Sequence, residues 1–190
     1  MANNENIFFD ISKLKSCGSN VIIGKTVRIR HPELVEIGDN VIIDDFTYIS
    51  TQLTIESHCH IASGSKIIGG PKAQVKMGNF STLAPNVVLA AGSDDYISGI
   101  ASPLVPKEYK GNVQIGCITL GKHSIVGANS VVLPDVMFGT GAAVGALSLV
   151  KDSLEDWVLY AGIPAKKISI RDKKAIINLE EQFYAKSRSN

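Results

Sequence analysis

An aliphatic residue recurs at every sixth position along most of this chain, and that period constrains the fold more than any other feature. The aliphatic positions fall in three blocks, which comprise Ile23, Ile29, Ile37, Ile43, Ile49, Ile55, Ile61 and Ile67, then Met77, Leu83 and Leu89, and finally Leu120, Val126, Val132, Phe138, Val144 and Val150. A helix repeats every 3.6 residues and a half-buried strand every two, so neither explains a period of six. The period fits a short strand followed by a tight corner, repeated so that each aliphatic side chain stacks on the one in the coil below.

The residues around each aliphatic position support this interpretation. The next residue is often glycine or aspartate, which suits a corner because glycine in particular adopts left-handed backbone angles at low cost. A small residue stands four positions later, as at Ser65, Ser81 and Ser124. Three hexads would form a triangular coil, and stacked coils would bury a shared core that no single coil has. We therefore expect an all-β fold, a parallel β-helix with one long loop and a C-terminal α-helix.

The places where the period fails divide the chain. We expect an N-terminal cap at residues 1–18, a β-helix at 19–151 that includes a long loop at 91–118, and a C-terminal segment at 152–190. Loops of that length in compact domains usually carry function. Residues 171–187 have a helical period, and one face of this expected helix comprises Ala175, Ile176, Leu179, Phe183 and Tyr184.

Composition excludes several classes of protein. The formal net charge is +1, so no overall field attracts nucleic acid or a membrane surface. No apolar run approaches the roughly 18 residues of a membrane span, and the first residues lack the pattern of a secretion signal. The cysteines, Cys17, Cys59 and Cys117, are far apart and form no CxxC pair. We expect a cytoplasmic protein without nucleic-acid or membrane partners.

The C-terminal hexads carry a more specific pattern. Three segments are diagnostic: residues 120–136 (LGKHSIVGANSVVLPDV), 144–152 (VGALSLVKD) and 160–166 (YAGIPAK). With these segments the chain resembles the hexapeptide-repeat acyltransferases, in particular the galactoside, maltose and polysaccharide-cluster sugar acetyltransferases. The resemblance implies a left-handed β-helix, a homotrimer, and acetyl-CoA bound between adjacent subunits without a metal. It also implies an acetyltransferase whose acceptor is a sugar hydroxyl or amine, on a polysaccharide or a nucleotide sugar.

The same resemblance assigns candidate cofactor residues. By similarity, the backbone around Ala128 and Ala146 should line the pantetheine arm of acetyl-CoA. The adenosine phosphates need positive charge, which Lys151, Lys166 and Lys167 would supply close to the end of the coils.

The catalytic base is predicted less directly. Asp94 falls where the galactoside and maltose enzymes have a loop histidine, and Asp95 follows it. His60 resembles a histidine of bacterial amino-sugar N-acetyltransferases that lies near the thioester, and imidazole titrates in the range that proton removal requires. Our hypothesis is that His60 of one subunit meets Asp94 and Asp95 of another. We expect His58 and His123 to face solvent without a chemical role.

Two other functions share this fold class. One is a scaffold protein without catalytic activity, which the long loop and the cofactor-like end of the chain argue against. The other is a metal protein of the γ-type carbonic anhydrase kind, which needs three converging histidines. The chain has 4 histidines, and the spacing typical of those enzymes is missing.

Overall fold

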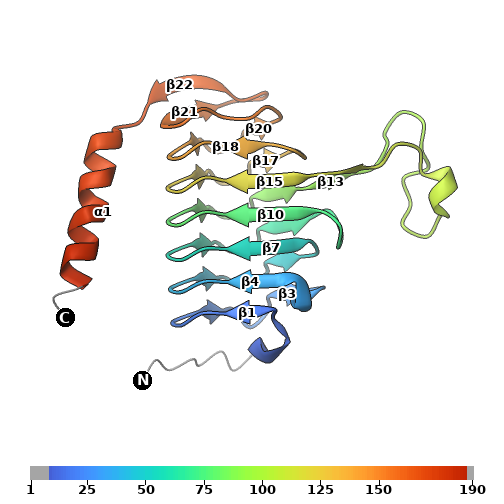
Figure 1. Ribbon diagram of the computed structural model, residues 1–190. Coiled ribbons are helices and arrows are strands. Elements are labelled where there is room, and N and C mark those ends of the chain that lie inside the picture. The colour runs from blue at the N-terminus through green and yellow to red at the C-terminus, as the bar shows by residue number, and fades with distance from the viewer. Residues whose placement is uncertain (1–8, 188–190) are drawn as a thin grey trace.

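The structure, a computed structural model, describes residues 9–187 and consists of short parallel strands stacked into a three-sided column (Figure 1). Within these residues each side of the column is a sheet, which we call face A, face B or face C. Face A contains β1 (Ser16–Cys17), β4 (Val35–Ile37), β7 (Gln52–Ile55), β10 (Gln74–Met77), β15 (Cys117–Leu120) and β18 (Met137–Phe138). Face C contains β3 (Arg28–Ile29), β6 (Tyr48–Ile49), β9 (Lys66–Ile68), β12 (Val88–Ala90), β17 (Val131–Val132) and β20 (Leu149–Val150).

Face B is the longest sheet. It contains β2 (Ile22–Ile23), β5 (Ile42–Ile43), β8 (His60–Ile61), β11 (Thr82–Leu83), β16 (Ile125–Val126), β19 (Ala143–Val144), β21 (Val158–Ala161) and β22 (Lys166–Ile170). Every pair except β21 with β22 is parallel, and each strand pairs with the equivalent strand one coil away, as when Ile61 lies opposite Ile43 and Leu83. The near strands run right to left while the chain climbs from N- to C-terminus, so the β-helix is left-handed (Figure 1). The expected fold class is confirmed, and its hand is the exception to the right-handed rule for parallel crossovers.

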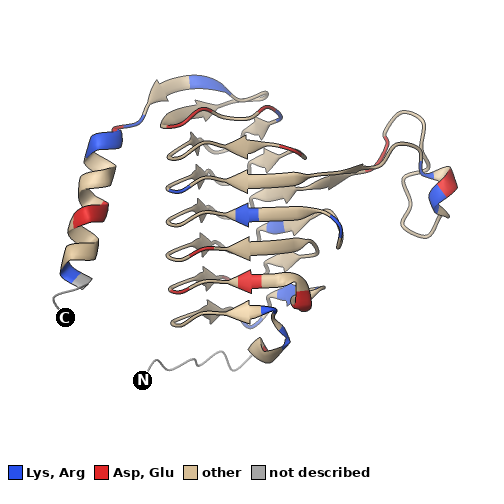
Figure 2. Cartoon of the chain, viewed as in Figure 1, with Lys and Arg blue, Asp and Glu red and all other residues tan. Residues whose placement is uncertain are grey.

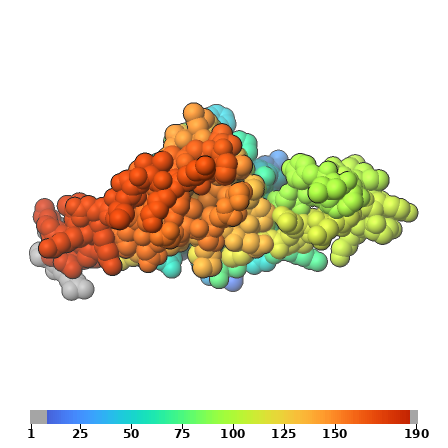
Figure 3. Space-filling model, turned by 90° about the horizontal axis from the view of Figure 1, so that it is seen from above, coloured from blue at the N-terminus to red at the C-terminus, as the bar shows by residue number. Residues whose placement is uncertain are grey.

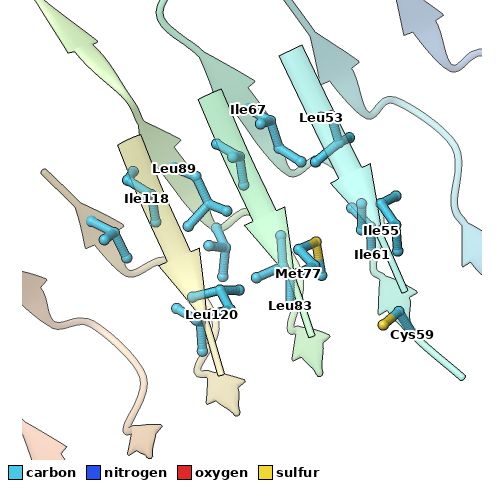
Figure 4. Packing of buried hydrophobic residues seen from close by; sticks show 14 of the residues in the cluster. Leu53, Ile55, Cys59, Ile61, Ile67, Met77, Leu83, Leu89, Ile118 and Leu120 are labelled. Atoms are coloured by element: carbon cyan, nitrogen blue, oxygen red, sulfur yellow. The ribbon is translucent and has the colours of Figure 1, made fainter. Parts of the chain in front are cut away.

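The aliphatic hexad positions form the core (Figure 4). Ile43, Ile61 and Leu83 are fully buried on face B, and equivalent residues of the other faces meet them inside the column. The small residues four positions later, such as Ser65 and Ser124, are also fully buried because they fit where successive strands turn toward the next face. Stacking thus gives each coil a core that it could not form alone.

The three edges of the column are tight corners with distinct side chains. We name them the A–B, B–C and C–A edges after the faces that they join. Backbone angles with positive φ occur at Asn20, Asn40, His58, Phe80, His123 and Trp157 on the A–B edge, and at Phe46, Gly64, Asn86, Asn129 and Leu147 on the B–C edge. Asparagine and glycine adopt this conformation readily, whereas large side chains there are uncommon and need a reason.

The long loop leaves the column at the C–A edge. Its two ends pair as the antiparallel strands β13 (Gly92–Ser93) and β14 (Gln114–Ile115), and its outer part holds the 3-10 helix η3 (Lys107–Tyr109). The loop is therefore shorter than the expected 91–118, because β15 already pairs from Cys117. Seen from above, it projects from the opposite side of the column to the C-terminal helix (Figure 3).

Both ends of the column differ from the expected boundaries. The predicted cap at 1–18 lies partly outside the described residues, and its remainder holds η1 (Ile11–Lys13) and the first strand β1. A second 3-10 helix, η2 (Pro32–Leu34), accommodates the residues inserted before β4. At the other end β21 adds a parallel strand within the segment 152–190, so stacking continues after the hexad pattern ends. Among the described residues no helix is long and apolar enough to cross a membrane.

Helix α1 (Lys173–Ser187) folds back along the A–B edge. Phe183 and Tyr184 meet the rings of His58 and Phe80 edge-on, at centroid distances of 5.1 to 6.3 Å. The expected apolar face is thus partly in contact, whereas Leu179 is 63% exposed.

The same helix corrects our expectation for His123, which does not face solvent. Its side chain is only 10% exposed, because its ring stacks on Phe80 at 5.0 Å and its Nε2 lies 2.8 Å from Glu180 Oε2. Lys122 also donates to Glu180. Burial alone would raise the pKa of Glu180, but the hydrogen bonds from Lys122 and His123 outweigh it and lower that pKa.

Candidate functional site

The B–C edge differs from the A–B edge in how its backbone N–H groups are used. At the A–B edge the second residue of most corners donates to a side chain of the adjacent coil, as Ser19 does to Asp39 at 2.7 Å and Thr140 to Asp156 at 2.8 Å. At the B–C edge the equivalent residues in four successive coils are Ser63, Pro85, Ala128 and Ala146. Within residues 9–187 the amides of Ser63, Ala128 and Ala146 have no acceptor, and proline has no N–H.

This row of unused donors follows from the small side chains on the edge. Alanine and glycine cannot reach back to cap a neighbouring amide, so the N–H groups of Ala128 and Ala146 stay unpaired on a half-exposed and an exposed residue. Successive coils are about 4.8 Å apart, so the amides of Ala128 and Ala146 are one coil apart, and that of Ser63 lies two coils below Ala128, past Pro85. A ligand with several amide carbonyls, such as a pantetheine arm, fits this row of donors, which we call the amide ladder.

A cleft lies at the C-terminal end of the column. Its lining includes the three predicted lysines, Lys151, Lys166 and Lys167, together with Glu155 and Tyr160. Lys151 Nζ lies 2.7 Å from Asp152 and Lys167 Nζ 2.9 Å from Glu155. The hydrogen bond to Glu155 raises the pKa of Lys167, which therefore stays charged near neutral pH. The structure thus brings the three lysines together at one cleft, where Lys151 and Lys167 are paired with carboxylates and Lys166 makes no ion pair within residues 9–187.

His60 lies on the outer side of face B and forms a pair with an aspartate that sequence reasoning missed. Its Nε2 lies 2.8 Å from Asp44 Oδ2, and the two side chains are 41% and 42% exposed. Asp44 directly follows β5, so the contact turns the imidazole toward the B–C edge, where the amide ladder runs. An aspartate in this position fixes the orientation of a histidine.

The long loop carries acidic residues at its base and near its tip (Figure 2), and the two aspartates, Asp94 and Asp95, have different surroundings. The Asp95 carboxylate accepts hydrogen bonds from the backbone N–H groups of Ile97, Ser98 and Asn112 and from the Ser98 hydroxyl, at 2.7 to 3.0 Å. The amide of Asn112 and the other donors hold the pKa of Asp95 well below its usual range. The Asp95 carboxylate therefore holds the loop in its folded conformation.

Asp94 lines a hollow of the loop with Tyr96, Asn112 and Gln114. Its carboxylate is exposed and has no donor within the described residues. Of the two aspartates, Asp94 is the one whose oxygens are available to a substrate.

One chain does not bring His60 and Asp94 together. The loop leaves the C–A edge, whereas His60 lies on face B, which is bounded by the other two edges. The two residues meet only if the loop of one subunit reaches the B–C edge of another.

Asp44 had a weak signal in the sequence. It occupies the position after an aliphatic hexad residue, where aspartate is an ordinary corner residue, and so it was not singled out. Its partner stands 16 residues later, close to one full coil, and that spacing brings residues of adjacent coils side by side. A search for acid–histidine pairs one coil apart would have found it.

The fold is that of the left-handed β-helix proteins, and comparisons with known proteins identify the chain as a transferase of that class. A family model described as bacterial transferase hexapeptide (six repeats) matches residues 35–69. The chain is 41% identical over 174 residues to dTDP-4-amino-4,6-dideoxy-D-glucose acyltransferase of Escherichia coli, which covers 89% of this chain and 88% of that protein. It is also 26% identical over 160 residues to galactoside O-acetyltransferase of Escherichia coli strain K12, with 75% of this chain and 74% of that protein covered.

A solved structure agrees over nearly the full length. AntD, an N-acyltransferase from Bacillus cereus solved in complex with dTDP and 3-hydroxybutyryl-CoA, superposes with a TM-score of 0.89 at 39% identity, covering 97% of this chain and 100% of AntD. The chain therefore belongs to the hexapeptide-repeat bacterial transferases. Within that family, the dTDP-4-amino-4,6-dideoxy-D-glucose acyltransferase of Escherichia coli and AntD, which both match most of this chain, are acyltransferases.

Proposed function

We propose that this protein transfers an acyl group from acyl-CoA to the amino group of a dTDP-linked 4-amino-4,6-dideoxy sugar. The chain is an acyl-CoA-dependent sugar acyltransferase, as its family and its near-full-length relatives indicate. An amine acceptor is favoured over a hydroxyl, because the Escherichia coli relative is named for a dTDP-linked amino sugar and AntD is an N-acyltransferase.

The observation that carries this proposal is the arrangement along the B–C edge. The unused amides of Ala146 and Ala128 descend from the end of the column that holds the lysine cleft, and the His60–Asp44 pair turns toward the same edge further down. We therefore expect the phosphates at the lysine cleft, the pantetheine arm along the two amides and the thioester at His60. The lysine cleft would hold the adenosine phosphates through Lys151, Lys166 and Lys167.

The chemistry needs a proton acceptor. The amine attacks the thioester carbonyl, a C–N bond forms, the C–S bond breaks, and the proton that the amine loses ends on the released thiol. His60, oriented by Asp44, would take that proton and return it to the leaving sulfur. Asp94 would hold the acceptor sugar, while Asp95 keeps the loop in shape for that contact.

A homotrimer completes the proposed site. Several large apolar side chains are exposed on face B and on the loop: Ile22, Ile42, Ile125, Tyr96, Ile97 and Leu104. Ile97 and Leu104 are at least 94% exposed, on a loop whose own hydrogen bonds hold it out from the column. A closed ring of subunits would cover such surfaces and bring Asp94 of one subunit to His60 of the next.

The experiment that tests the site compares three variants. His60→Ala should lower turnover by about 100-fold or more, the usual range for loss of a general base, with little change in the affinity for acyl-CoA. Asp44→Asn should lower kcat, by less than His60→Ala does, and leave the affinity for acyl-CoA unchanged, because it removes the carboxylate that orients His60. Asp45→Asn is the matched control, since Asp45 binds the Thr26 amide and hydroxyl at 2.8 Å and has no contact with His60.

The outcomes separate the alternatives. Near-normal turnover of His60→Ala together with an inactive Asp94→Asn would assign proton transfer to the loop carboxylate. If both variants retain activity, the amine acceptor reacts without a protein base. Equal kcat values for Asp44→Asn and Asp45→Asn would contradict a role of Asp44 in positioning His60.

A further inference from the structure

The outward side chains of face C change character halfway along the column. In the register of the sheet, Arg28, Tyr48 and Lys66 lie side by side in the first three coils. This row of outward side chains continues through the aliphatic residues Val88, Val131 and Leu149 in the next three coils. The cationic and aromatic part therefore borders the N-terminal half of the B–C edge, beyond the amide ladder of Ala128 and Ala146.

The two cations of this row, Arg28 and Lys66, have no acidic partner within the described residues. Within residues 9–187, Arg28 and Lys66 make no ion pair, whereas Lys15, Lys122 and Lys151 each have one. Lys66 Nζ donates to the Gly64 carbonyl at 3.0 Å, which turns the ammonium group toward the B–C edge.

The two carboxylates of the adjoining B–C corner are already engaged. Asp45 accepts from the Thr26 amide and hydroxyl, and Asp44 pairs with His60. The charge of Arg28 and Lys66 is therefore available to an anion from outside the chain.

Phe46 stands on the same stretch of the edge and has no structural explanation. Its φ is +63°, a conformation that bulky residues rarely adopt, yet its side chain is 69% exposed. Phe80 and Trp157 have similar backbone angles, but Phe80 stacks between two histidines and Trp157 is buried against Gly141. Leu147, further along the same edge, also combines a positive φ with an exposed side chain, whereas Asn86 and Asn129 adopt this conformation more readily, so Phe46 carries a backbone cost that no packing of its ring offsets.

From this juxtaposition we infer that Arg28, Phe46 and Lys66 form a subsite for the nucleoside diphosphate part of the acceptor. The cations bind the two phosphates, and the exposed ring lies against the base. The inference rests on the proposed function, because it names where the nucleotide of that acceptor is held. Arg28 and Lys66 are two coils, or about 10 Å, apart, so their flexible side chains can converge on one diphosphate above Tyr48.

Direct binding of nucleotides tests the subsite without any acyl transfer. Calorimetric titration with dTDP and with thymidine should show clear binding of dTDP and much weaker binding of thymidine. Lys66→Ala and Arg28→Ala should each weaken dTDP roughly 10-fold, the range for loss of a hydrogen bond to a charged group. Lys76→Ala is the matched control, because Lys76 is an exposed cation at an outward position on face A.

Phe46→Asn should lower the affinity for dTDP without lowering the melting temperature. Removing the ring should weaken dTDP roughly 5-fold or more, the range for loss of a base-stacking contact. The same substitution should leave the melting temperature unchanged or raise it, because asparagine relieves the backbone strain. A merely structural Phe46 would instead show a lower melting temperature or loss of the oligomer on substitution.

The results separate this inference from the proposed function. If dTDP binds all three variants as tightly as the unaltered protein, the subsite is wrong even when acyl transfer to the amino sugar is observed. If dTDP affinity falls in the three variants but not in Lys76→Ala, the subsite stands whether or not an amino sugar is acylated. Equal affinity for dTDP and thymidine would overturn the role of the cations.

Discussion

Replacing Glu180 by alanine should release helix α1 from the A–B edge while leaving the β-helix folded. The Glu180 carboxylate, 11% exposed, is the polar link between the helix and the column, because it binds both His123 and Lys122. Without it, His123 stays under the helix with its Nε2 unpaired. Lys122, which is 38% exposed, can turn to water instead.

The magnitude follows from these two contacts. The hydrogen bond from the largely buried His123 contributes about 1.5–2 kcal/mol, whereas the ion pair with Lys122, which is 38% exposed, contributes about 0.5 kcal/mol or less. Leaving His123 unpaired beneath the helix adds to the loss, so we expect the docking of α1 to weaken by about 2–3 kcal/mol. That is a factor of roughly 30 to 150 in the population of the undocked helix.

Trp157 allows this change to be observed. It is the only tryptophan, its ring lies 6.1 Å from that of His123, and the Lys173 ammonium lies 5.9 Å from its centroid. Undocking should therefore shift its emission and expose residues 171–187 to protease, whereas Glu181→Ala, on an exposed neighbour, should change neither. Unaltered emission and protease resistance of Glu180→Ala would refute the reasoning.

The pH dependence of this effect has a definite sign. Because the pKa of Glu180 is lowered in the folded protein, its contribution is fully present above its ordinary value near 4.5 and is lost as pH falls through the folded pKa. The difference between the unaltered protein and Glu180→Ala should therefore be largest near neutral pH and shrink in acid.

Three further predictions concern assembly and the donor. Light scattering should give about three times 20.3 kDa, and a monomer at all concentrations would exclude the shared site. Lys151→Glu and Lys166→Glu should weaken CoA more than dephospho-CoA, and equal losses for both ligands would show that these lysines do not bind the phosphate. Ala128→Pro should weaken acyl-CoA about 2- to 10-fold without destabilising the fold, because Pro85 already occupies the equivalent corner. Ala128→Ser, which keeps the N–H, should bind normally, and unchanged binding by both variants would exclude this amide.

The hexad period was sufficient to predict the fold because each aliphatic position has a single role. A residue such as Ile61 can be buried only if its strand stacks on the coil below, so periodicity alone fixed the architecture. The predicted helix at 171–187 was also confirmed, with α1 starting two residues later. The strand β21 was missed because its segment, which ends at Ala161, keeps the stacking but departs from the hexad spacing.

The site was less predictable, since it depends on contacts between side chains of different coils and of the loop. The sequence indicated His60 but not Asp44, because their contact joins two coils. It placed His123 on the outside of a coil, correctly, but not under α1, because helical periodicity identifies an apolar face and not the surface it covers. The different settings of Asp94 and Asp95 depend on how the loop folds around Asp95, which no repeat specifies.

The central claim is most directly tested by a thiol-release assay with dTDP-4-amino-4,6-dideoxyglucose as acceptor and either acetyl-CoA or 3-hydroxybutyryl-CoA as donor. The account predicts thiol release that depends on the amino sugar, with mass spectrometry showing a product heavier by one acyl group on nitrogen. The 4-hydroxy sugar nucleotide should give no release above background. Release that is independent of the amino sugar, or equal release with the hydroxy sugar, would contradict an N-acyltransferase.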